Sequence, residues 1–321
     1  MKGYKMLKAD MTTLHGNMEY EIGRTYRFDG EIIPCIQGYH FSKDLIDCLG
    51  YYHNENNDRR FFEIEAGADV IELKDKCVTD EITLVRELSL EEVFQYIREN
   101  KDTVNWTTIS NWQKLSEEFM REFKDKINWH CISMSQQLTA EFIQEFEDRL
   151  NWYYISDYQK LSEDFIREFE HKVSWYCISM NQKLSEEFIR EFDDRVDWDC
   201  ISKHQKLSEE FIRENQNKLD WRCISKYQQL SEDFIREFED KVYWYSISKY
   251  QKLSGEFIRE FEDKVSWYCI WRYQKLSERF IREFKDTADW RYISKYQKLS
   301  EEFIREFQDR IDCDSLSEFE E

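Results

Sequence analysis

The chain has 321 residues, of which 41% are hydrophobic, 17% aromatic and 35% charged, and its formal net charge is −21. The hydrophobic and aromatic content excludes an intrinsically disordered chain, and the acidity argues against general electrostatic binding to double-stranded DNA or to an anionic membrane. Pro34 and seven of the eight glycines lie in the first 67 residues, which leaves Gly255 alone for the rest. The composition therefore predicts a first domain with turns and a second that is almost wholly helical.

Residues 1–87 are predicted to form a small, mostly β domain of the α+β class. Short segments rich in β-branched and aromatic residues alternate with Gly, Asn and Asp turns. Ser42 is expected to cap one helix that carries Leu45, Ile46, Cys48 and Leu49 on its inner side. The expected strands are 4–8, 20–22, 25–28, 61–65, 70–73 and 82–86.

Two site hypotheses fall in this domain. Cys35, His40, Cys48 and His53 have the residue types that bind zinc, but their spacing matches no established zinc motif, so buried cysteines and a loop histidine are favoured. His40, Tyr52 and Glu63 resemble the histidine, aromatic and glutamate order of ADP-ribosyltransferases. A structural role for His40 and Tyr52 is favoured here too, and no cofactor is expected.

The first 90 or so residues carry motifs of a recognisable kind: GYK, YEIG-x-TY, Gly38-Tyr39-His40-Phe41, FFEIEA and LVREL. They resemble a small uncharacterised domain found in phage, bacterial and giant-virus proteins. The helical segment LSEEFIREF-x-DKV-x-W-x-x-IS resembles repeats encoded by large DNA viruses related to mimivirus. These resemblances imply a viral protein made in an infected cytoplasm, and they imply no established activity.

Residues 88–105 are predicted to form an N-capping helix, because Ser89 and Glu92 make an S-x-x-E capping box. Nine 23-residue repeats follow over 106–312, each beginning with a tryptophan, from Trp106 to Trp290. Such a period is typical of a solenoid, which we expect to be all-α and either right- or left-handed. Residues 313–321 are expected to form a C-terminal cap and an acidic tail.

Each repeat is predicted to contain two helices. Helix A, of about two turns, begins at the tryptophan after an Asn, Asp or Ser cap. Helix B, of about three turns, begins after Leu-Ser, and its glutamates come one residue too early for a capping box. Opposite its apolar stripe, Glu122→Lys126, Glu168→Lys172 and Glu237→Lys241 are spaced for ion pairs within the helix.

Partner-binding candidates are the residues that vary between repeats or that recur on helix A. Lys-Tyr-Gln runs at the end of helix A indicate either a single-stranded RNA surface or tyrosines that cover the seam between repeats while the lysines offset nearby acid. Trp271 replaces a serine and Asn215 a phenylalanine, which indicates drift or, alternatively, a local bend or a specific contact patch. The candidates are Tyr153, Arg222, Tyr227, Tyr250, Trp271, Arg291 and Tyr296.

The favoured function is a non-enzymatic scaffold that binds a protein partner through an acidic solenoid surface. An ADP-ribosyltransferase-like domain targeted by the solenoid is one alternative, and single-stranded RNA binding through the Lys-Tyr face is another. No stretch approaches the roughly 20 apolar residues of a membrane span, and no signal peptide is visible, so we expect a cytoplasmic chain that is not secreted.

Overall fold

The computed structural model describes residues 1–13, 18–50, 59–74, 76–111 and 115–312. It divides into a first part, Met1–Gln159, and a second part, Lys160–Glu321, which are described separately below. Tyr52, His53 and the expected C-terminal cap at 313–321 lie outside the described residues. No helix within the described ranges is both long enough and apolar enough to cross a bilayer.

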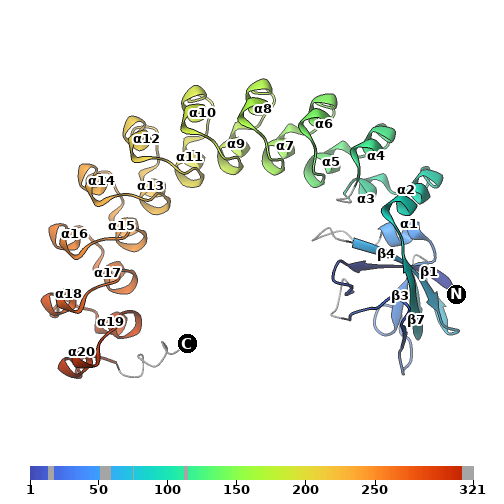
Figure 1. The fold of residues 1–321 in the computed structure, drawn as a ribbon, viewed down its shortest axis with the longest axis horizontal. Coiled ribbons are helices and arrows are strands. Elements are labelled where there is room, and N and C mark those ends of the chain that lie inside the picture. The colour runs from blue at the N-terminus through green and yellow to red at the C-terminus, as the bar shows by residue number, and fades with distance from the viewer. Residues whose placement is uncertain (14–17, 51–58, 75, 112–114, 313–321) are drawn as a thin grey trace. The chain divides into compact units, whose positions relative to one another are not determined.

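The first part begins with two antiparallel sheets (Figure 1). A four-stranded sheet has the order β1-β4-β7-β2, and a three-stranded sheet has the order β3-β6-β5. Their shared core includes Leu7, Phe41, Phe62, Ile64 and Cys77, all buried. The strands are β1 (Lys2–Lys8), β2 (Thr25–Arg27), β3 (Tyr39–Phe41), β4 (Arg59–Ala66), β5 (Val70–Glu72), β6 (Cys77–Thr79) and β7 (Glu81–Glu87).

The predicted α+β class is confirmed, and three details differ. Strands β3 and β6 are three residues each and pair with one another, a length too short to give a clear alternating pattern. Residues 20–22 form no strand, and Tyr20 instead packs in the core. Helix α1 spans Leu45–Gly50, while Ser42 pairs through its backbone with Tyr4 and does not cap the helix.

Helix α2 (Leu90–Glu99) has the predicted capping box. The Ser89 hydroxyl accepts from the Glu92 backbone N–H at 3.2 Å, and the Glu92 carboxylate accepts from the Ser89 N–H at 2.8 Å. Two N-terminal amides are thereby satisfied reciprocally. Val93, Phe94 and Ile97 form the buried side of the helix.

The remaining helices alternate between A and B as the 23-residue period predicts, which confirms the α-solenoid. The A helices are α3 (Trp106–Ser110), α5 (Trp129–Ser135), α7 (Trp152–Tyr158), α9 (Trp175–Asn181), α11 (Trp198–His204), α13 (Trp221–Tyr227), α15 (Trp244–Tyr250), α17 (Trp267–Tyr273) and α19 (Trp290–Tyr296). The B helices are α4 (Glu117–Glu122), α6 (Ala140–Glu145), α8 (Glu163–Glu168), α10 (Glu186–Glu191), α12 (Glu209–Glu214), α14 (Glu232–Glu237), α16 (Gly255–Glu260), α18 (Glu278–Glu283) and α20 (Glu301–Glu306).

Helix B is shorter than predicted. It spans six residues and ends at the second phenylalanine of the repeat, where a run of turns takes over. The ring that ends helix B packs on the tryptophan of the same repeat; in the repeat that starts at Trp244, the Trp244 and Phe261 ring centres are 4.9 Å apart. A helix of this length is unstable alone, so its stability comes from packing.

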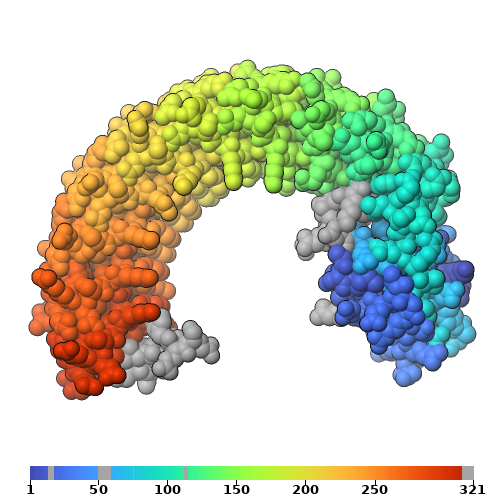
Figure 2. Space-filling model, in the orientation of Figure 1, coloured from blue at the N-terminus to red at the C-terminus, as the bar shows by residue number. Residues whose placement is uncertain are grey.

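In the second part the helices form two rows, with the A helices on the concave side and the B helices on the convex side (Figure 1). The space-filling view shows successive repeats in close contact along this part (Figure 2). The isoleucines of helix A and the first phenylalanines of helix B are almost completely buried, for example Ile224 and Phe234. They form a continuous apolar layer between the two rows.

Buried polar side chains join each repeat to the one before it. Nε2 of Gln228 donates to the carbonyls of Ser202 at 3.1 Å and Gln205 at 2.8 Å, and its Oε1 accepts from the Leu207 N–H at 3.0 Å. The same pattern recurs at Gln205, Gln251 and Gln274. This column of glutamines thus satisfies the backbone where helix A ends without a glycine.

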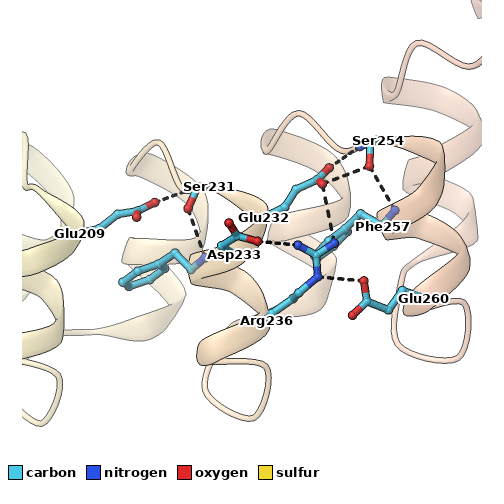
Figure 3. Close-up of polar contacts among 9 residues, drawn as sticks. Glu209, Ser231, Glu232, Asp233, Arg236, Ser254, Phe257 and Glu260 are labelled. Atoms are coloured by element: carbon cyan, nitrogen blue, oxygen red, sulfur yellow. Dashed lines mark hydrogen bonds and ion pairs between the residues drawn. The ribbon is translucent and has the colours of Figure 1, made fainter.

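The glutamates that looked misplaced cap the following repeat (Figure 3). Glu232, the first residue of α14, accepts from the Ser254 N–H at 2.5 Å, and Ser254 in turn accepts from the Phe257 N–H at 3.1 Å. Glu209 makes the same contact with Ser231 at 2.6 Å. The capping box is therefore completed between repeats.

Ion pairs on the B row also run between repeats (Figure 3). Arg236 donates to Glu260 of the next repeat at 2.8 Å, and its guanidinium lies 5.1 Å from the ring centre of Phe257 in that repeat. Arg236 also donates to Asp233 of its own helix at 2.8 Å. The predicted pairing of Glu237 with Lys241 is wrong: Glu237 pairs with Arg213, and Lys241 donates to Gln216. Helix α14 ends at Glu237, so Lys241 does not lie one helical turn further along it, and stacking instead brings together residues 24 or 25 positions apart.

Candidate functional site

The two rows of the second part carry opposite charge. The A helices α11, α13, α15, α17 and α19 contain seven basic residues and one acidic residue. The B helices α12, α14, α16, α18 and α20 contain six basic and thirteen acidic residues. The concave row is therefore a basic surface within an acidic protein.

Cations and tyrosines alternate along this basic row, with a cation in each repeat from Lys203 to Arg272 and a tyrosine in each repeat from Tyr227 to Tyr296. Nζ of Lys226 lies 4.7 Å from the ring centre of Tyr227 in its own repeat and 5.5 Å from that of Tyr250 in the next. Lys249 repeats the arrangement at 5.0 Å from both Tyr250 and Tyr273. We call this set the cation–tyrosine ladder: Lys203, Lys226, Lys249, Arg272, Tyr227, Tyr250, Tyr273 and Tyr296.

The ladder follows from the sequence of helix A. Its fifth and sixth residues after the tryptophan are a basic residue and, in most of these repeats, a tyrosine. The basic residue comes two positions after the isoleucine that packs against helix B and so lies on the other side of helix A, while the tyrosine comes three positions after it and lies at the flank of the packed side. The four ladder tyrosines are between 37% and 45% exposed.

The ladder cations lack carboxylate partners. Within the described ranges, no Asp or Glu lies at ion-pair distance from Lys203, Lys226, Lys249 or Arg272, whereas the B-row arginines are paired with glutamates. The hydrogen bond with the Tyr227 hydroxyl raises the pKa of Lys226, and Tyr250 does the same for Lys249. The expectation that these lysines offset neighbouring acid is therefore not met.

The predicted partner-binding residues fall into three groups. Tyr227, Tyr250 and Tyr296 belong to the ladder. Arg222 and Arg291 are exposed on the same row, the first 5.8 Å from the Tyr243 ring centre and the second paired with Asp289. Tyr153 is 51% exposed on α7 in the first part, against Tyr154.

The prediction that Trp271 binds a partner is wrong, because its side chain is only 1% exposed and offers no surface to a partner. Its ring stacks on Trp267 at 5.3 Å between centres and lies 6.3 Å from Phe280. Its indole Nε1 is buried without a hydrogen-bond partner. Asn215, the other departure, is accommodated by a hydrogen bond from its amide to the Phe211 carbonyl at 3.0 Å.

Sequence reasoning missed Lys203, Arg272 and Tyr273 as ladder members. The signal was present as a basic residue at one repeat position in five consecutive repeats, from Lys203 to Lys295. The sequence does not show that each cation contacts the tyrosine of the following repeat. The cation and tyrosine of a single repeat can be recognised in the sequence, whereas their continuation from repeat to repeat as a ladder cannot.

In the N-terminal sheets, His40 and Glu63 have separate structural partners. His40 Nε2 accepts from the Cys35 N–H at 3.0 Å, and burial lowers the pKa of His40. Glu63 forms a two-pronged ion pair with Arg86 on β7, at 2.6 Å and 3.0 Å. The two side chains lie on strands of different sheets, and Tyr52 is outside the described residues.

The described zinc candidates form no ligand group. Cys35 is exposed in a loop at positive φ, while Cys48 is buried and burial raises the pKa of its thiol to about 12. Among the residues that the structure describes, no three His, Cys, Asp or Glu side chains are placed to hold a metal ion. His53, the fourth candidate, is not described.

A buried lysine that the sequence did not single out lies beside His40. Lys5 on β1 is 8% exposed, and its Nζ donates to the His40 carbonyl at 2.6 Å and lies 5.1 Å from the Tyr20 ring centre. Burial lowers the pKa of Lys5 to about 8. The charged form of this lysine is therefore costly in the folded state.

Comparisons with known proteins concern the N-terminal region. Residues 1–96 match DUF7666, a domain of unknown function, which covers both sheets, α1 and most of α2. No curated protein and no solved structure matches the chain. The expectation of an uncharacterised N-terminal domain is confirmed, and none of these comparisons links the repeats to a virus.

Proposed function

We propose that the chain is a non-enzymatic binding protein that recognises a protein partner through the concave row of its solenoid. The observation that carries the proposal is the cation–tyrosine ladder, which presents exposed tyrosines and cations without carboxylate partners. Tyrosine and arginine are enriched where proteins recognise other proteins. In this proposal the N-terminal domain anchors or positions the array, and the chain acts in a cytoplasm, that of an infected cell if it is viral.

The surface differs from the acidic one that the sequence favoured. The B-row carboxylates are occupied in capping and pairing neighbouring repeats, as at Glu209, Glu237 and Glu260. Groups that hold repeats together are poor recognition groups, because a partner must displace their existing bonds. On the A row, Lys203, Lys226 and Lys249 contact tyrosine rings of the next repeat but pair with no carboxylate among the described residues, so they can still form ion pairs with a ligand.

A peptide selection on the full chain tests this proposal. A random peptide library displayed on phage is selected against the wild-type chain, and the enriched peptides are measured on a variant with Tyr227→Ser, Tyr250→Ser and Tyr273→Ser. Binding is expected to fall at least tenfold, because truncating three exposed interface tyrosines removes several kcal/mol, about 1 kcal/mol or more each.

A B-row variant controls for indirect effects. Glu210→Ser, Glu256→Ser and Glu302→Ser change three exposed side chains on the convex row of the same part, and binding is expected to stay within twofold of wild type. Equal loss in both variants, or no loss in the tyrosine variant, would show that the ladder is not the binding surface.

A further inference from the structure

The properties of the ladder restrict which class of protein ligand it can bind. The ligand class assigned below rests on the proposed function. The ladder cations have no carboxylate partners among the described residues, the tyrosine rings are already in contact with cations, and one cation recurs in each successive repeat. Each of these features restricts the ligand. From the three together we infer that the ladder binds an extended acidic peptide segment in the polyproline II conformation, with a carboxylate at every third residue.

Charge is the first restriction. The four cations at Lys203, Lys226, Lys249 and Arg272 lie in successive repeats, and none has an Asp or Glu at ion-pair distance among the described residues. Cations held together without counter-charges favour an anionic ligand, because it relieves their mutual repulsion. The tyrosine hydroxyls beside them can donate further hydrogen bonds to carboxylate oxygens.

The state of the rings is the second restriction. Tyr227, Tyr250 and Tyr273 each contact two cations, one from their own repeat and one from the repeat before. A single nucleic-acid strand is held on such surfaces by bases stacked on free ring faces. Rings already covered by cations favour a ligand that reaches the cations without stacking, which a carboxylate side chain does.

Spacing is the third restriction. Adjacent A helices pack directly on one another, as α13 does on α15, and helices in contact lie about 8–10 Å apart. A polyproline II segment rises about 3.1 Å per residue with three residues per turn, so every third side chain returns to one face after about 9 Å. One carboxylate per repeat then matches four cations along about ten residues.

Fluorescence anisotropy on the full chain tests the inference with four probes. These are a labelled Glu-Pro-Pro repeat peptide, a Gln-Pro-Pro repeat, a Glu-Pro repeat with the same number of carboxylates, and single-stranded oligouridine. We expect the Glu-Pro-Pro peptide to bind most tightly, the Gln peptide at least tenfold more weakly, and the affinity to fall as salt rises.

Two arginine variants in one repeat separate local contact from general charge. Arg272→Gln removes a ladder cation, and Arg279→Gln removes an exposed arginine from the B row of the same repeat. Both change the net charge equally. We expect Arg272→Gln to weaken the Glu-Pro-Pro peptide about two- to fivefold and Arg279→Gln to leave it unchanged; Lys249→Gln provides a second ladder variant should Arg272→Gln disturb folding.

The inference is overturned if the Gln or Glu-Pro peptide binds as tightly as the Glu-Pro-Pro peptide, if both arginine variants act equally, or if no peptide probe binds. It is overturned in favour of a phosphate-bearing strand if oligouridine binds more tightly and Arg272→Gln weakens that complex. Failure of these probes leaves the proposed function standing when phage-selected peptides still depend on the ladder tyrosines.

Discussion

Trp271 is the residue at which the array departs furthest from its own pattern. In the other described repeats this position is a buried serine whose hydroxyl accepts from a backbone N–H eighteen residues later, as Ser248 does from Ser266 at 2.9 Å. The repeat that contains Trp271 also has Ala288 where the other repeats have Val, Ile or Leu. Ser248 bonds the residue that directly follows the aliphatic Val265, so the equivalent positions of Trp271 and Ala288 lie near one another, and we interpret the small residue as making room for the large one.

This interpretation predicts that Ala288→Val destabilises the wild-type chain but stabilises the Trp271→Ser variant, which a double-mutant cycle measures. Trp271→Ser alone leaves a cavity and is expected to destabilise the chain by about 2–4 kcal/mol, and Ala288→Val alone is expected to destabilise it by crowding the indole. The double variant restores the regular pattern and should recover most of the loss. Urea unfolding measures all four chains, and additive single effects would refute the coupling.

Lys5 illustrates the cost of a buried charge. The only side-chain hydrogen bond that Lys5 makes within the described chain is to the His40 carbonyl, and no carboxylate is paired with it. Since the folded pKa, about 8, lies below the ordinary value of 10.5, the unfolded chain binds more protons between these values. The Lys5 contribution to stability therefore rises with pH through that window and is at its least favourable below about pH 8.

Lys5→Met is expected to stabilise the N-terminal region at pH 7 by on the order of 1–3 kcal/mol. The gain should shrink as pH rises from about 8 towards 10.5, because the wild-type lysine becomes neutral. The Cys48 thiol interacts electrostatically with Lys5, but burial raises its pKa to about 12, so in the folded chain it stays protonated through this window. A gain that does not vary with pH would mean that Lys5 is neutral or well solvated in the fold.

Among the helices, the glutamine that follows each helix A takes the place of the glycine that ends many helices. Helix A ends at a glutamine in an extended conformation, for example Gln228, and that side chain bonds three backbone groups of the preceding repeat. Neither helix of a repeat has the length to be stable by itself. Each repeat is thus stable only against its neighbours, which is the basis of cooperative unfolding in solenoids.

Adjacent glutamines allow a matched test. Gln228→Ala removes all three hydrogen bonds and leaves the buried Leu207 N–H unsatisfied, so we expect a loss of about 2–4 kcal/mol. Gln229→Ala changes the neighbouring glutamine, which is exposed, and is expected to shift stability by less than about 0.5 kcal/mol. Urea unfolding of the two variants distinguishes these outcomes, and similar values would show that the column is dispensable.

At the scale of the whole molecule, the net charge of −21 conceals an internal division. In the second part the acid is concentrated on the B row, where arginines of neighbouring repeats partly neutralise it, while the A row is basic. Surface ion pairs contribute little individually. Their regular repetition instead sets the register of one repeat on the next and leaves the concave row free to carry a different chemistry.

The period, the two helices of each repeat, their Ser, Asn and Asp caps and the mostly β first domain could be predicted from the sequence, because these features depend on local spacing and propensity. The sequence did not determine which groups meet across repeats. The contacts of Glu232 with Ser254, Arg236 with Glu260 and Lys226 with Tyr250 join residues 22 to 24 positions apart, and the burial of Trp271 depends on the same stacking. The contacts between repeats and the burial of Trp271 follow from the tertiary structure, because such residues become neighbours when one repeat packs on the next.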